Sequence, residues 1–242
     1  MFDTYTHTHT HTRHIHTRNR YTLSTSECQR IHHLSVSSNS ITSIALNQNG
    51  SWLALGSATL GQLLVWEWES ETYVIKQQGH ISDVTALTYN SDSSTLVTGG
   101  TSGKIKLWQT RTGFCYATFT QHTASINAIQ YIASSNAIVS ASSDGTVRAY
   151  DLFRYRNFRT MTTPSPCRLI SLAVDSGGEV VAAGSFDPPE IYLWSLRTGK
   201  LVDVLSGHEA PVSTLQFSPT EPLLASGSWD HTVRLWEPYK NT

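Results

Sequence analysis

The sequence predicts an all-β fold of about five similar four-stranded units, because three features agree. An aromatic residue ends a short alternating segment five times, at Trp66, Trp108, Tyr150, Trp194 and Trp236. The intervals between these residues are 42, 42, 44 and 42 positions. A period of roughly 40–45 residues is typical of the four-stranded blade of a β-propeller. No stretch shows a sustained apolar period of about 3.6 residues with helix caps, so little helix is expected.

Each unit also carries the pattern of a strand with one buried face. The residues one and three positions before the aromatic are apolar in every unit: Leu63 and Val65, Ile105 and Leu107, Val147 and Ala149, Ile191 and Leu193, Val233 and Leu235. Alternation with a period of two indicates a half-buried strand. Upstream segments such as 84–89 and 213–217 alternate similarly and lead into turn residues. The predicted blade units are about 38–79, 80–121, 122–165, 166–207 and 208–242.

The first residues of the chain differ in kind from the repeats. Thr and His alternate from Thr6 to Thr12 without apolar periodicity. We therefore predict a disordered leader over residues 1–27 and a propeller segment over residues 28–242. The leader histidines could capture a divalent metal, but nothing fixes their geometry, so no metal or cofactor is expected.

Charge and cysteine content exclude several classes of protein. The chain has 17 Lys and Arg against 18 Asp and Glu, which gives no strong field for nucleic acid or acidic lipid. Its 3 cysteines form no CxxC pair, so neither a disulfide framework nor a zinc site is predicted. There is no apolar run of about 18 residues and no signal-peptide pattern, so we expect an intracellular protein without a membrane partner.

A His, Ser and Asp trio in the last unit suggests either a hydrolase or a structural network. His208, Ser226 and Asp230 lie 28, 10 and 6 positions before the aromatic Trp236. The third unit repeats the same offsets with His122, Ser140, Asp144 and Tyr150. The second unit repeats part of them with His80, Thr98 and Trp108, and has Ser102 at the Asp position. A catalytic set occurs once per active site, whereas this trio recurs 86 residues apart. We therefore predict buried structural networks, no catalytic residues and no small-molecule substrate; a hydrolase would need the trio exposed.

The first and fourth units lack the trio, and the chain as a whole is expected to form an incomplete ring. Ser38 and Pro166 occupy the His offset, and Leu60 and Pro188 the Asp offset, so these blades should depend on packing alone. A candidate strand near residues 31–36 could complete the last unit, which ends without an outer strand. The expected fold is a five-unit arc that is open or only strained shut.

The repeated Gly-His start, Asp-containing turn and aromatic end resemble the WD-repeat family over about residues 29–238. This resemblance implies that the His, Ser or Thr, Asp and Trp of one blade form a buried hydrogen-bonded tetrad. Four longer segments are similar to one branch of that family, the periodic tryptophan protein 2 family: 61–80, 112–123, 144–160 and 206–236.

That closer resemblance implies a biological process. It implies a non-enzymatic scaffold of the nucleolar small-subunit processome, in its UTP-B subcomplex, needed for small-subunit rRNA processing. The implied partners are other processome proteins, with pre-rRNA or small nucleolar RNA as candidate contacts. The alternative is a generic WD-repeat adaptor, such as a ubiquitin-ligase substrate receptor, which needs only the fold.

One segment of the third unit suggests a contact site. Guanidinium and aromatic groups interleave at Arg154, Tyr155, Arg156, Phe158 and Arg159, a composition suited to phosphate pairing and base stacking. These residues are a candidate partner or RNA contact. The alternative is that they are simply the outer strand of the third blade, because residues 114–119 occupy the same place in the second unit.

Overall fold

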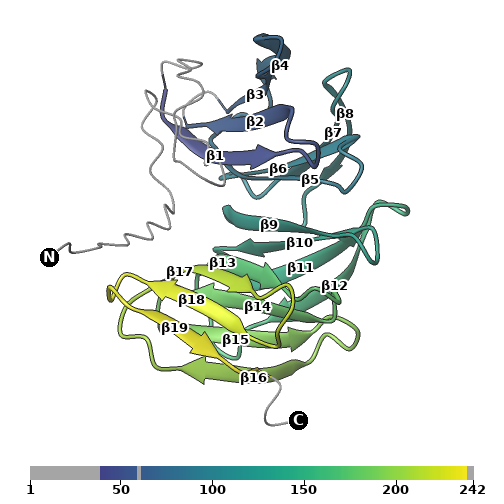
Figure 1. Cartoon of the computed structure of the whole chain (residues 1–242). Coiled ribbons are helices and arrows are strands. Elements are labelled where there is room, and N and C mark those ends of the chain that lie inside the picture. Colours follow the sequence, from purple (N-terminus) through teal and green to yellow (C-terminus); the bar gives the residue numbers. More distant parts are fainter. Residues whose placement is uncertain (1–38, 59–60, 239–242) are drawn as a thin grey trace, which may run out of the picture.

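The computed structural model describes residues 39–58 and 61–238, and within these ranges the chain forms nineteen strands and no helix (Figure 1). The strands, blade by blade, are β1 (Ile41–Leu46), β2 (Trp52–Ser57), β3 (Gln62–Glu67) and β4 (Thr72–Gln78); β5 (Val84–Tyr89), β6 (Thr95–Gly100), β7 (Ile105–Gln109) and β8 (Phe114–Phe119); β9 (Ile126–Ile132), β10 (Ala137–Ser142), β11 (Thr146–Asp151) and β12 (Arg156–Thr162); β13 (Leu169–Val174), β14 (Val180–Ser185), β15 (Glu190–Ser195) and β16 (Leu201–Ser206); β17 (Val212–Phe217), β18 (Leu224–Ser228) and β19 (Val233–Trp236).

Each sheet is an antiparallel meander in which neighbouring strands are also neighbours in sequence. The first four sheets have four strands, and the last has three among the described residues. Every sheet lies inside one of the predicted units, and the all-β, incompletely closed architecture is confirmed. Figure 1 shows the sheets following one another from β1–β4 in purple and blue to β17–β19 in yellow, without closing into a ring. The predicted leader and the candidate strand near residues 31–36 lie outside the described residues.

Side-chain hydrogen bonds tie each blade to the next through its innermost strand. The Thr42 hydroxyl donates to the carbonyl of Val84, and the Thr85 hydroxyl to the carbonyl of Ile126. The equivalent bonds farther along the chain join Asn127 Nδ2 to Leu169 O at 2.5 Å and Ser171 Oγ to Val212 O at 2.7 Å. Each acceptor is the first residue of the next inner strand, so the bonds fix the register between blades.

The hydrophobic core lies between blades rather than inside any one of them. Ile105 and Leu107 of β7, for example, pack in one cluster with Ile126, Ile138 and Tyr150 of the third blade. The inward residues of β15 pack in the same way against the fifth blade. Since burial of apolar area is the main stabilising term, each blade depends on its neighbours for stability.

In the four-stranded blades, the turn between the first two strands lies beside the turn between the last two strands. Backbone bonds join them in the second, third and fourth blades: Thr110 N to Ser94 O (2.9 Å), Leu152 N to Asn136 O (3.2 Å) and Leu196 N to Glu179 O (2.8 Å). We call this side of the molecule the turn face. The opposite side carries the loops between blades and the remaining turns, which are joined by bonds such as Ser143 N to Ser125 O at 2.9 Å.

Candidate functional site

The last blade contains a continuous hydrogen-bonded network of the four predicted residues. His208 Nδ1 lies 2.7 Å from Asp230 Oδ2, and His208 Nε2 lies 2.7 Å from Ser226 Oγ. Trp236 Nε1 donates to the same serine oxygen at 2.8 Å. Because a carboxylate only accepts, Nδ1 is the donor of the histidine ring, and Nε2 accepts from the serine hydroxyl. The network joins the loop before β17, which holds His208, to strands β18 and β19, which hold Ser226 and Trp236.

The third blade repeats this geometry with one change. His122 Nδ1 lies 2.8 Å from Asp144 Oδ2, and His122 Nε2 lies 2.8 Å from Ser140 Oγ. Burial raises the pKa of Asp144, but hydrogen bonds from His122 and a neighbouring threonine outweigh burial and hold the pKa well below its usual range. The aromatic is Tyr150, whose ring stacks on Phe119 at 4.4 Å instead of donating to the serine. Its buried hydroxyl has no hydrogen-bond partner among the described residues.

Two threonines belong to these networks and were not predicted. Thr146 Oγ1 donates to Asp144 Oδ1 at 2.7 Å, and Thr232 Oγ1 donates to Asp230 Oδ1 at 2.7 Å. Each follows its aspartate by two positions, so this pair shows the same 86-residue recurrence as the trio. That recurrence was the signal that could have found them.

The second blade holds an incomplete network. His80 Nε2 lies 2.7 Å from Thr98 Oγ1, which also accepts from Trp108 Nε1 at 2.8 Å. His80 Nδ1 is buried and has no partner among the described residues, because Ser102 replaces the aspartate. Burial, with Lys106 and Lys104 nearby, lowers the pKa of His80 to about 4.

The first and fourth blades replace the polar network with apolar contacts. In the third blade Ser140 pairs with Arg148 across the sheet; the residues in that register are Leu55 in the first blade and Ala183 in the fourth. Trp194 Nε1 donates instead to the backbone carbonyl of Thr162 at 3.4 Å. Trp66 Nε1 is buried without a hydrogen-bond partner in the described ranges. Of the offset positions, Ser38 and Leu60 lie outside those ranges.

The burial of the serines bears on the hydrolase alternative. Ser226 is 1% exposed and Ser140 is 0% exposed. A nucleophile must reach its substrate, and neither hydroxyl can do so in this arrangement. Satisfying buried polar groups of a loop instead avoids a cost of about 1–3 kcal/mol for each group left unpaired. In the part of the chain that the structure describes, no three His, Cys, Asp or Glu side chains form a metal-binding group, and no helix could span a membrane.

The structure divides the predicted contact segment into two parts. Arg154, Tyr155 and Arg156 are exposed in the β11–β12 turn and at the start of β12, with Arg154 Nη1 3.9 Å from Asp151 Oδ2. Phe158 packs against the core between the third and fourth blades. Arg159 donates to the backbone carbonyls of the fourth-blade residues Leu196 (3.3 Å) and Arg197 (2.6 Å). The outer-strand interpretation therefore describes Phe158 and Arg159, and only the first three residues are available to a partner.

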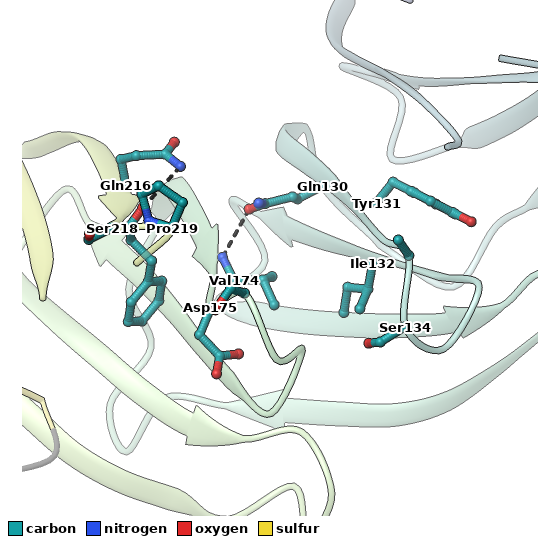
Figure 2. Close-up of a pocket in the computed structure, with 12 residues that line it drawn as sticks. Gln130, Tyr131, Ile132, Ser134, Val174, Asp175, Gln216, Ser218 and Pro219 are labelled. Carbon is teal, nitrogen blue, oxygen red and sulfur yellow. Dashed lines mark hydrogen bonds between the residues drawn. The ribbon is translucent and has the colours of Figure 1, made fainter. Parts of the chain in front are cut away.

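A cavity of about 290 Å³ lies at the ends of the inner strands β9, β13 and β17 (Figure 2). Figure 2 shows Gln130 bonded to the backbone of Val174, where Gln130 Oε1 accepts from Val174 N at 2.9 Å. Asp175 Oδ1 accepts from the backbone N–H groups of Glu179 (2.7 Å) and Val180 (2.9 Å). These polar groups hold the strand ends and turns, so we assign no chemistry to the cavity.

Comparison with known proteins agrees with this architecture. The family model "WD domain, G-beta repeat" matches residues 26–67, 71–109, 113–151 and 199–237. The unmatched stretch covers most of the fourth blade, which lacks the His and Asp of the tetrad.

Individual relatives extend the similarity over most of the chain. The chain is 60% identical to periodic tryptophan protein 2 homolog of Mus musculus over 88% of its length, 50% identical to that of Dictyostelium discoideum over 88%, and 58% identical to periodic tryptophan protein 2 of Saccharomyces cerevisiae over 85%. It spans only 22–23% of the length of these relatives. With its repeating blades, its tetrads and these matches, the chain belongs to the WD domain, G-beta repeat family.

Proposed function

We propose that the intact protein represented by this chain is a non-enzymatic scaffold subunit of the nucleolar small-subunit processome, in its UTP-B subcomplex, and that it is needed for small-subunit rRNA processing. The observation that carries the proposal is the 47–60% identity to proteins named periodic tryptophan protein 2, from animals, a plant, a slime mould and fungi, over 85–88% of the chain. The resemblance to that family implies this process.

The geometry of the chain is suited to a scaffold. Rigid blades that present two sides of turns and loops can hold several partners at once with little ordering cost. The His–Ser–Asp networks of the third and fifth blades fix the loops that enter those blades, since each joins its loop to the second strand of the blade and to the turn that follows that strand. The near-neutral charge of −1 favours protein partners for most contacts, with RNA contacted locally.

The proposal is tested with the full-length protein in cells. A tagged copy is expected in the nucleolus and in pre-ribosomal fractions, together with other processome proteins. Depletion should reduce mature small-subunit rRNA and leave large-subunit rRNA largely intact. Normal small-subunit rRNA after depletion, or a cytoplasmic protein absent from pre-ribosomal fractions, would overturn the proposal.

The second candidate function is a generic WD-repeat adaptor, such as a ubiquitin-ligase substrate receptor. It is supported by the fold alone, since one fold hosts many functions. Copurifying partners separate the two candidates: ubiquitin-ligase subunits in place of pre-ribosomal proteins would favour the adaptor.

A further inference from the structure

Four aromatic side chains are exposed along the outer edge of the second and third blades. Phe114 and Tyr116 belong to the outer strand β8, and Phe153 and Tyr155 to the β11–β12 turn. Phe114 is 66% exposed and Phe153 is 76% exposed. We call these four residues, together with Arg154 and Arg156, the basic–aromatic edge. Large apolar groups gathered at one surface indicate a binding site more often than single exposed ones do.

A ring contact joins the two blades within this edge. The rings of Tyr116 and Tyr155 meet edge to face, with centroids 5.8 Å apart and planes at 75°. The hydroxyl of Tyr116 lies 3.0 Å from Thr95 Oγ1, which orients its ring. The rings are therefore held on one surface that crosses the blade boundary.

The backbone at Tyr155 argues for a role of its ring. Tyr155 has a φ of 49°, in the left-handed region that favours glycine. The same turn position is Gly113 (φ 69°) in the second blade and Gly199 (φ 74°) in the fourth, while the first blade has Glu71 (φ 54°). A bulky aromatic residue at such a position is unfavourable for folding, and strained residues of this kind gather at functional sites.

The arginines of the edge make it complementary to an anionic partner such as a nucleic acid strand. Arg154 and Arg156 flank Tyr155, and the exposed Arg111 lies in the adjacent β7–β8 turn. The acidic neighbours are Asp151, beside Arg154, and Asp92, whose charge acts on Tyr116. A surface that binds a single strand combines cations with stacking rings, because each nucleotide brings a phosphate with its base, and the exposed arginines beside these rings are complementary to such a strand.

We propose that the basic–aromatic edge binds single-stranded RNA. Bases stack on Phe114, Phe153 and Tyr155, and the guanidinium groups of Arg154 and Arg156 pair with the phosphates between them. The proposal deepens the proposed function and rests on it for the source of the strand, which is pre-rRNA.

Binding is measured by fluorescence anisotropy of a labelled A-rich 12-nucleotide RNA with the full chain, at 50–200 mM salt. Two phosphate contacts should give a slope of log K against log salt of about −1.4. The double variant Arg154→Gln/Arg156→Gln should bring that slope close to zero. Phe153→Ala should weaken binding about tenfold or more, from loss of one stacked base.

Tyr155→Gly separates binding from folding. It should weaken binding about tenfold or more and leave the thermal midpoint equal or higher, because glycine suits the backbone there. The matched control is Trp229→Ala, which should leave the affinity for RNA unchanged. Trp229 is an exposed aromatic residue in the β18–β19 turn, on the side of the molecule opposite the turn face.

Three outcomes would overturn the proposal: no RNA binding by the wild-type chain at 50 mM salt; equal weakening by Trp229→Ala; or edge variants that keep RNA affinity but lose a copurifying protein, which would make the edge a protein interface. The proposed function fails separately. A chain that binds RNA through this edge in vitro, in a protein absent from pre-ribosomes, would overturn the processome role and leave the edge assignment standing.

Discussion

The second and fifth blades place identical residues in contrasting surroundings. Leu107 and Leu235 both stand one position before the aromatic of their blade, at the same place in the third strand. Leu107 is 0% exposed because the third blade packs against it, whereas Leu235 is 70% exposed and its neighbour Val233 is 75% exposed. The alternating pattern therefore specifies a strand with one apolar face, and an adjacent blade determines whether that face is buried.

The same contrast holds for the hydrogen bonds of the inner strands. The Thr85 hydroxyl donates within its blade to Gly99 O at 3.1 Å and also to Ile126 O of the next blade. Ser213 occupies the equivalent position in β17, where its hydroxyl donates within its own blade to Gly227 O at 3.2 Å. The histidines of the third and fifth blades, by contrast, lie at nearly the same distances from their serines and aspartates. Contacts inside a blade thus do not depend on a following blade.

The largest expected effect on stability comes from shortening the two leucines that are compared above. Leu107→Ala should lower the free energy of unfolding by about 2–5 kcal/mol, because it opens a cavity between two blades. Leu235→Ala should change it by less than about 0.5 kcal/mol, because the side chain is already largely in water. Urea titration of both variants measures the difference.

Equal losses for the two leucines would show that the face of β19 is covered in solution. Sedimentation would then distinguish a second copy of the chain, which adds mass, from a segment of the same chain, which does not.

The second blade should lose stability in mild acid because its histidine lacks an aspartate. The pKa of His80 is about 4 in the folded protein and about 6.5 when unfolded, so the unfolded state binds the proton first as the pH falls. The stability that neutral His80 contributes is complete above pH 6.5 and is lost progressively toward pH 4. The loss corresponds to roughly 3 kcal/mol.

Urea unfolding of the wild-type chain and His80→Gln between pH 7 and 4 isolates this contribution. The two stability curves should converge as the pH falls. Parallel curves would mean that His80 does not titrate in this window.

The His–Ser–Asp networks of the third and fifth blades should respond alike to mutation. His122→Ala and His208→Ala each remove one hydrogen bond from a buried serine and one from an aspartate that keeps its threonine donor, and each should cost about 2 kcal/mol. Each network lies within its own blade, so the two losses of stability should agree although the third blade has a blade on either side and the fifth does not. A thermal midpoint of His208→Ala equal to that of the wild type would refute the structural role of this histidine.

Much of the fold follows from the sequence because antiparallel register fixes spacing. Ser226 faces Arg234 across the β18–β19 ladder, two positions before Trp236, and the third blade repeats this register at Ser140 and Arg148. Constant offsets from the aromatic therefore locate the blade units and the tetrad residues without a structure.

Features that depend on neighbouring sheets could not be predicted in this way. Leu235 and Leu107 occupy the same position in the alternating sequence pattern, and that pattern carries no information about the next blade. The sequence does not distinguish Arg159 from Arg154, although only Arg159 donates hydrogen bonds to backbone carbonyls of the fourth blade. The contact of Tyr116 with Tyr155 joins residues of two different sheets, and no periodic pattern in the sequence predicts it.

Completing the second-blade network is the smallest expected effect. Ser102 has the offset of Asp144, and the glycines that follow them, Gly103 and Gly145, share nearly the same φ of 77° and 79°. A carboxylate in Ser102→Asp can therefore accept from the unpaired Nδ1 of His80. The gain should be about 1 kcal/mol at pH 7, below that of a full tetrad, because Lys104 stands where the other networks have threonine.

The charge of the new carboxylate, rather than its shape, should produce this gain. Ser102→Asp should also raise the pKa of His80 and weaken the acid sensitivity of the chain, since the ion pair favours the protonated ring. Ser102→Asn, similar in shape but uncharged, is the matched control and should leave the acid sensitivity in place. An equal gain from both substitutions would show that a neutral hydrogen bond is sufficient, and that the aspartates of the third and fifth blades do not act through their charge.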